Sequence, residues 1–173
     1  GRESGGYVAA SLFSEELDYL SRSFVNGRNG LQGLLAQPFN VLLTWGQGAN
    51  DLDLHMTGPT GTGQTDRFHI YYAATGNLQG FPFAALIRDC ICRSGSEVIL
   101  TSNLLGGGVY RVSVFNFGDQ SANSNNLSNL SEARIQIVRG GVAVPQGNGT
   151  TIQGGRLILD TVVPVGQSGN TWV

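Results

Sequence analysis

Hydrophobic residues recur with two different periods along this chain. Near the N-terminus, Ser14 precedes two glutamates and an apolar face formed by Leu17, Leu20 and Phe24, which predicts a short helix. Beyond residue 38, short apolar or alternating runs are separated by clusters of Gly, Asn, Ser and Pro, which is typical of β-strands. The strands predicted from these runs cover residues 39–45, 51–57, 67–73, 83–89, 97–102, 109–117, 133–138 and 156–163, and a last one begins at Thr171.

About nine short strands without helical patterns between them favour an antiparallel β-sandwich over a parallel α/β sheet. The 26 glycines fit this interpretation, because many fall in the turn signals between the runs. A length of 173 residues suits one domain of ordinary size. We therefore predict an N-terminal helical or linker segment over residues 1–38 and a β-sandwich domain over residues 39–173.

Composition excludes several classes of function. The formal net charge of -2 offers no basic surface for a polyanion, so nucleic acid is not an expected partner. All ten basic residues are arginines, which removes mechanisms that need a lysine amine. The sequence contains no run of about 18 apolar residues, so it predicts no transmembrane helix. The first residues lack the layout of a signal peptide, which leaves both a mature secreted protein and an excised domain open.

The segment from Trp45 to Gly61 carries the clearest chemical signal. In its predicted strand the odd positions are polar, so Asp51, Asp53 and His55 share one face. Two carboxylates about 7 Å apart repel each other when ionised, and a bound cation relieves that repulsion. Calcium is the natural candidate because it accepts oxygen ligands in irregular geometry. The alternative is a polar, solvent-facing strand edge beside a turn.

This segment also carries a family resemblance. The runs WGQGANDLDLHMTGPTG, FHIYYAATG, SEVILTSNLLGGGVYRVSVFNF and VPVGQSGNTWV, in this order, resemble the secreted YfaP-like β-sandwich family over residues 39–173. The matching positions are Asp51, Asp53, His55, Pro59, Gly61, Asp89, Glu97, Gly108, Tyr110 and Trp172.

The resemblance extends the candidate metal site and suggests a setting. It adds Asp89 and Glu97 to Asp51 and Asp53, so we expect these four residues to hold one calcium ion. The family has no established enzymatic activity and belongs to bacterial envelope or surface proteins. It therefore implies a non-enzymatic structural or adhesive module at an extracellular, cell-surface or periplasmic location. Its partner would be a protein or a cell surface, and an open sheet edge would permit self-association.

Two other functions stay open. His55, His69 and Asp53 would supply the three ligands of a metal-dependent hydrolase if their strands converge, whereas no GxSxG motif predicts a serine hydrolase. A glycan-binding module is the other alternative, with Trp45, Trp172 and Tyr72 as candidate stacking residues.

Cys90 and Cys92 form the sequence's one CxC pair. In an extended strand their side chains point the same way about 7 Å apart, which favours unpaired, partly buried cysteines, since a local disulfide needs a turn. A bridge to another chain and half of a metal site also stay open. The polar stretch over residues 118–131 is expected to be a long exposed loop.

Overall fold

The computed structural model describes residues 38–61, 66–106, 109–119, 125–166 and 171–172. Within these residues the chain forms antiparallel sheets with little helix, so the all-β prediction is confirmed. The predicted N-terminal helix falls outside the described residues. Among the described residues, no helix has both the length and the apolar character needed to cross a membrane.

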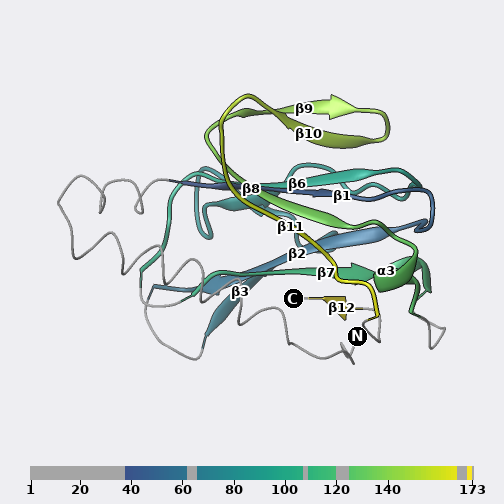
Figure 1. Cartoon of the computed structure of the whole chain (residues 1–173). Helices are drawn as coiled ribbons and strands as arrows, with labels where there is room; N and C mark the ends of the chain where they lie inside the picture. The colour runs from purple at the N-terminus through teal and green to yellow at the C-terminus, as the bar shows by residue number, and fades with distance from the viewer. Residues whose placement is uncertain (1–37, 62–65, 107–108, 120–124, 167–170, 173) are drawn as a thin grey trace, which may run out of the picture.

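Two larger sheets and one hairpin make up the fold (Figure 1). The six-stranded sheet has the order β11 (Arg156–Val162), β8 (Arg134–Arg139), β1 (Asn40–Thr44), β6 (Ser96–Thr101), β5 (Ala84–Leu86) and β4 (Gly76–Asn77). The four-stranded sheet has the order β12 (Thr171–Trp172), β7 (Arg111–Asn116), β2 (Leu52–Pro59) and β3 (Arg67–Ile70). The hairpin pairs β9 (Val142–Gln146) with β10 (Gly149–Gln153), and two short helices, η1 (Phe117–Asp119) and α3 (Asn126–Asn129), follow β7.

The hydrophobic core is formed by alternate residues of the two larger sheets. Because successive strand residues point to opposite faces, every second side chain of a strand enters the core. The buried core side chains from the strands of these two sheets are Val41, Leu43, Leu52, Leu54, Met56, Phe68, Ile70, Ala84, Leu86, Ile99, Val112, Val114, Ile135 and Ile137. Each aliphatic side chain buried in this way contributes about 1.5–3 kcal/mol relative to an exposed one.

The hairpin β9–β10 was not predicted from the sequence. It lies over β6 and β1 as a separate layer in Figure 1, and β10 packs against β6. On the face of the six-stranded sheet that points away from the shared core, Leu42, Val98 and Val138 are nevertheless buried. A Cβ at Gly149 would lie 2.2 Å from the carbonyl oxygen of Ser96, so the close approach of hairpin and sheet requires glycine there. The nine expected strands thus become twelve in the described residues, with β4, β9 and β10 added.

The stretch over residues 118–131 is only partly the exposed loop that its polarity predicts. It includes α3, in which Leu127 is buried, and the buried Ser131 donates its hydroxyl hydrogen bond to the Leu127 carbonyl. At its start, the Gly118 N–H donates a hydrogen bond to the carbonyl oxygen of Asp51 over 3.2 Å. This contact fixes the start of the stretch beside the beginning of β2.

Candidate metal centre

An interruption in sheet pairing creates the candidate site. β2 pairs with β7 from Leu52 to Thr57, but its pairing with β3 covers only Met56 to Pro59. Among the described residues, the first half of β2 therefore has no strand beside it on the β3 side. The Leu54 N–H on this half donates instead to the carboxyl group of Glu97 on β6, over 2.8 Å to Oε2.

Three aspartates meet beside this half of β2. Asp51, Asp53 and Asp89 each offer a carboxylate oxygen, and these three oxygens lie within 4.8 Å of one another. Asp51 and Asp53 are only 6% and 2% exposed, whereas Asp89 is exposed. Asp51 Oδ1 and Asp53 Oδ2 are buried without a hydrogen-bond partner. The cluster thus has two buried carboxyl groups, each with one oxygen that lacks a hydrogen-bond partner, and a third carboxyl group on its solvent side.

The protonation of the cluster reflects its burial. Burial raises the pKa of Asp51 to about 6, with the Asp89 charge adding to the shift. Burial raises the pKa of Asp53 to about 8, and the charges of Asp51 and Asp89 add to it. Without a counter-charge, ionised carboxylates are costly here, because they are desolvated and repel one another. A divalent cation would remove both penalties at once.

Glu97 lies next to the cluster but has a different set of contacts. Its side chain is fully buried, its Oε2 accepts from Leu54, and its Oε1 accepts the Cys90 N–H over 3.0 Å. Burial raises its pKa to about 9; the two backbone hydrogen bonds oppose this shift and the charges of Asp53 and Asp89 reinforce it. Glu97 is not in the close group of three oxygens. Its contacts make it a bridge between β2 and the segment that carries Asp89.

That segment contains a disulfide, so the expectation of unpaired cysteines was wrong. Cys90 and Cys92 are bonded, with their Cα atoms 5.4 Å apart. The predicted strand over residues 83–89 ends early, since β5 stops at Leu86, and the chain bends at residues 92–94. The two cysteines therefore do not lie in an extended strand, and their Cα separation is within the range that a disulfide spans. Trp45 secures it by donating its indole N–H to the Cys92 carbonyl over 2.8 Å.

His55 and His69 meet, but apart from the aspartate cluster. His55 Nδ1 and His69 Nε2 are 2.8 Å apart, and Tyr71 stacks on both rings. Burial, with the His69 charge second, lowers the pKa of His55 to about 4. Asp53, the third residue of the hydrolase alternative, belongs to the aspartate cluster, and within the described residues the one close group of three ligand side chains is Asp51, Asp53 and Asp89.

The aromatic residues considered for glycan stacking have different environments. Trp45 is buried and uses its indole N–H on Cys92, so its ring is not an open platform. Tyr72 is exposed and makes edge contacts with Tyr71 and Phe117. The side chain of Trp172, like the whole of Gly108, is outside the described part of the chain.

No protein-family model matches this chain, and no match was found among the curated proteins or the solved structures. The fold and the site therefore define a class of protein. It is an all-β protein with a largely buried cluster of three aspartates beside the part of β2 that is not paired with β3. The resemblance to the YfaP-like family stays a prediction.

Proposed function

We propose that this chain is a non-enzymatic β-sandwich module of an exported or surface-exposed protein, stabilised by one calcium ion at Asp51, Asp53 and Asp89. The observation that carries the proposal is a close group of three carboxyl side chains, two of which each have a buried oxygen without a hydrogen-bond partner. Buried polar atoms normally have partners, and an unmet set of anionic oxygens is what a hard cation binds.

Calcium fits this donor set better than the other common ions. All three side chains offer oxygen, whereas zinc in proteins favours histidine nitrogen and cysteine sulfur. Magnesium requires near-ideal octahedral geometry, whereas calcium accepts irregular sets of oxygens. The expected role is structural, because the ligands tie β2 to the segment around Asp89. The carbonyl contact of Asp51 with Gly118 extends this link to the start of η1.

The extracellular, cell-surface or periplasmic setting is supported by the disulfide. Cys90 and Cys92 are bonded, and disulfides form and persist mainly in oxidising compartments. This agrees with the setting that the YfaP-like resemblance implies. The expected partners are proteins or cell surfaces.

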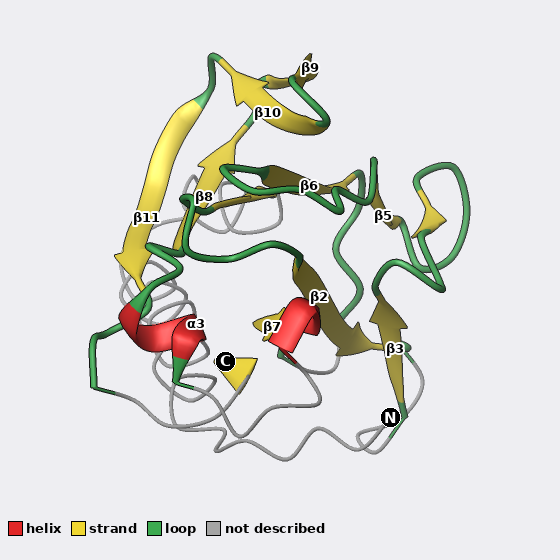
Figure 2. Ribbon diagram, turned by 90° about the vertical axis from the view of Figure 1, so that its right-hand side faces the viewer, coloured by secondary structure: helices red, strands yellow, loops and turns green. Residues whose placement is uncertain are grey.

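A second copy of this chain is one expected partner, and an open sheet edge supports such self-association. β11 is the terminal strand of the six-stranded sheet (Figure 2). Its Leu157 and Val162 are both exposed. If two copies of β11 pair antiparallel in the register centred between Leu159 and Asp160, Leu157 of one copy lies opposite Val162 of the other. Such an edge presents unpaired backbone groups to a second strand.

Thermal unfolding in EDTA and in calcium, magnesium or zinc tests the calcium site. A ligand at about 100 times its Kd stabilises the folded state by about 2.7 kcal/mol, or about 5–10 °C for a domain of this size. We expect calcium to give a rise of this order and Asp53→Asn to abolish it. In EDTA, Asp53→Asn should melt at the wild-type temperature or above, because it removes a carboxyl group whose ionisation the metal-free folded state opposes and the unfolded chain permits.

Asp66→Asn is the matched control. Asp66 is exposed and precedes Arg67, which pairs with Pro59 at the far end of β2. This variant should keep the full calcium response. Equal melting temperatures of the wild type in EDTA and calcium, or a full calcium response in Asp53→Asn, would refute the site.

A further inference from the structure

The third ligand of the proposed site is held differently from the other two. Asp51 immediately precedes β2 and Asp53 lies within it, where pairing with β7 fixes the backbone. Asp89 lies beyond the end of β5 in irregular backbone, and its side chain is exposed. Its position therefore depends on the contacts on either side of it: the Ile87 N–H, which donates to the Val98 carbonyl over 3.0 Å, and the contacts of residues 90–92.

At residues 90–92, two hydrogen bonds and one covalent bond hold the chain. The Cys90 N–H donates to Glu97, and the Cys92 carbonyl accepts from Trp45. Between these two anchors, Ile91 is largely exposed and gives no buried attachment. The disulfide joins these two residues directly and closes a covalent ring that includes the Ile91 backbone.

The ring holds the backbone in a contracted form. The Cα atoms of Cys90 and Cys92 are 5.4 Å apart, shorter than the roughly 6.5–7 Å that two residues span in an extended strand. When the bond is broken, the chain is free to lengthen toward the extended form. Cys92 is held by the Trp45 indole and the buried Cys90 by Glu97, so the lengthening strains both contacts, and a shift of Cys90 carries Asp89 beside it.

We propose that the Cys90–Cys92 disulfide completes the cation site, so that its reduction weakens cation binding by releasing Asp89 while Asp51 and Asp53 stay on β2. This inference rests on the proposed calcium site and adds its regulation. Calcium affinity then depends on oxidation of the chain, and the site reaches full strength only after the disulfide forms.

The reducing step is an ordinary thiol–disulfide exchange with a dithiol. Cys92 is partly exposed and Cys90 is buried, so the dithiol attacks the Cys92 sulfur and releases the Cys90 thiolate. The second thiol of the reagent then closes on the mixed disulfide and releases the Cys92 thiolate. Two electrons and two protons pass to the cysteines, and the reagent leaves as a cyclic disulfide.

Calorimetric titration of the full chain with calcium, before and after dithiol treatment, tests the proposal. Reduction should raise the Kd at least tenfold, which corresponds to about 1.4 kcal/mol. Asp89→Asn should bind weakly in both states, and reduction should change its Kd by less than twofold. This non-additivity is expected because the disulfide acts through Asp89.

A double variant and two accessory measurements keep the result unambiguous. Cys90→Ser/Cys92→Ser should reproduce the weak Kd of the reduced chain without any reductant. A thiol count should confirm two free thiols after reduction, and circular dichroism in EDTA should show that the sheets persist.

The outcomes separate this inference from the proposed function. Calcium binding by the oxidised chain with an unchanged Kd after reduction would overturn the disulfide's role and leave the calcium site standing. An equal loss of affinity on reduction in wild type and Asp89→Asn would also overturn it. Absence of calcium binding in both redox states would remove the calcium site itself, and this inference with it.

Discussion

Glu97 offers its carboxyl oxygens to two backbone N–H groups that are far apart in the sequence. One belongs to Leu54 on β2 and the other to Cys90 in the disulfide segment. A buried N–H that loses its acceptor costs about 1–3 kcal/mol, so this carboxyl has a structural role even without a metal. In this it differs from Asp51 and Asp53, each of which has one buried oxygen, Oδ1 and Oδ2 respectively, without a hydrogen-bond donor.

Glu97→Gln should therefore distinguish a structural role of Glu97, through its two hydrogen bonds, from a role as a calcium ligand. The glutamine amide can accept only one of the two N–H groups, so the variant should lose about 1–3 kcal/mol of stability in EDTA, measured by urea unfolding. Its calcium Kd should stay within a few-fold of the wild type, because Glu97 is outside the close group of three oxygens. Asp53→Asn provides the opposite pattern as a control. Unchanged stability in EDTA together with loss of calcium binding would make Glu97 a ligand, as the sequence suggested.

At the residue scale, the sequence predicts what local spacing determines. Asp51 and Asp53 were found because alternation in one strand places both on one face. The bridging role of Glu97 depends on Leu54, 43 residues away, and no periodicity encodes that contact. The disulfide was missed because the extended geometry assumed for Cys90 and Cys92 does not hold where the chain bends.

At the element scale, strands were predicted where they build the core and missed where they lie outside it. β2 and β7 alternate between apolar and polar positions because one face of each enters the shared core, whereas β1 and β6 carry short apolar runs, since Leu42 and Val98 are buried on the outer face as well. The hairpin β9–β10 packs on an outer face, and its Val142 and Pro145 do not follow that pattern. The hairpin packs there because the outer face carries apolar side chains, such as Val98, which are buried from water when the hairpin covers them.

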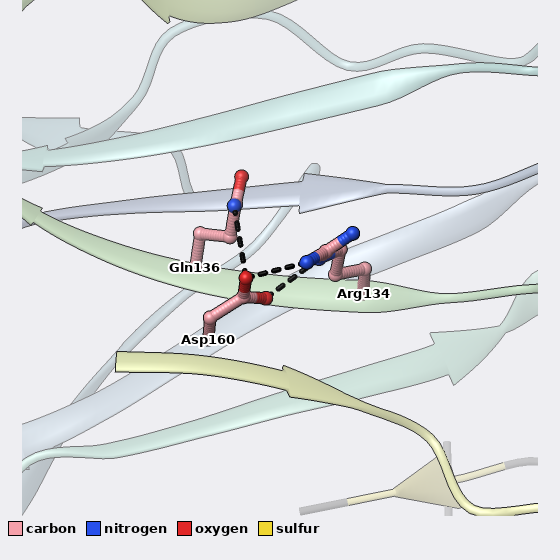
Figure 3. A network of polar contacts seen from close by, with 3 residues as sticks. All are labelled: Arg134, Gln136 and Asp160. Carbon is pink, nitrogen blue, oxygen red and sulfur yellow. Dashed lines mark hydrogen bonds and ion pairs between the residues drawn. The ribbon is translucent and has the colours of Figure 1, made fainter. Parts of the chain in front are cut away.

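The β11 edge is firmly attached on its inner side. Asp160 accepts two hydrogen bonds from the Arg134 guanidinium on β8, over 2.6 and 2.5 Å, and a longer one of 3.4 Å from Gln136 (Figure 3). These contacts are exposed to solvent, so they fix register more than they add stability. The outer side of β11 has no strand beside it among the described residues.

A charge on this edge should prevent the proposed self-association. We expect the wild type to show concentration-dependent dimerisation in sedimentation velocity and Leu157→Lys to remain monomeric, because an edge lysine opposes strand pairing. Phe81→Lys is the control, since Phe81 is 54% exposed, similar to Leu157 at 51%, and lies between β4 and β5 at the other edge of the sheet. A monomeric wild type up to millimolar concentration, or equal loss of the dimer in both variants, would contradict an interface at β11.

At the scale of the whole molecule, the buried ionisable groups make stability depend on pH in two opposite ways. The pKa values of Asp51, Asp53 and Glu97 are raised to about 6, 8 and 9, so the metal-free folded state retains protons that the unfolded chain releases. Their contribution is complete below about pH 4 and is lost as the pH rises through these values. The pKa of His55 is lowered to about 4, so its contribution is lost as the pH falls from about 6.5 toward 4.

These signs predict a falling melting temperature in EDTA between pH 7 and pH 9, where Asp53 and Glu97 lose their protons and His55 no longer titrates. Saturating calcium should remove most of that fall, because the ion stabilises the ionised carboxylates, whose formation is unfavourable in the metal-free protein. The stabilisation by calcium should accordingly grow between pH 6 and pH 8, as protons cease to compete for Asp51 and Asp53. Asp53→Asn should flatten the curve in EDTA, since it removes the group with a pKa of about 8. Scanning calorimetry across this range measures both trends, and a calcium shift that is constant from pH 6 to pH 8 would show that the ion binds elsewhere.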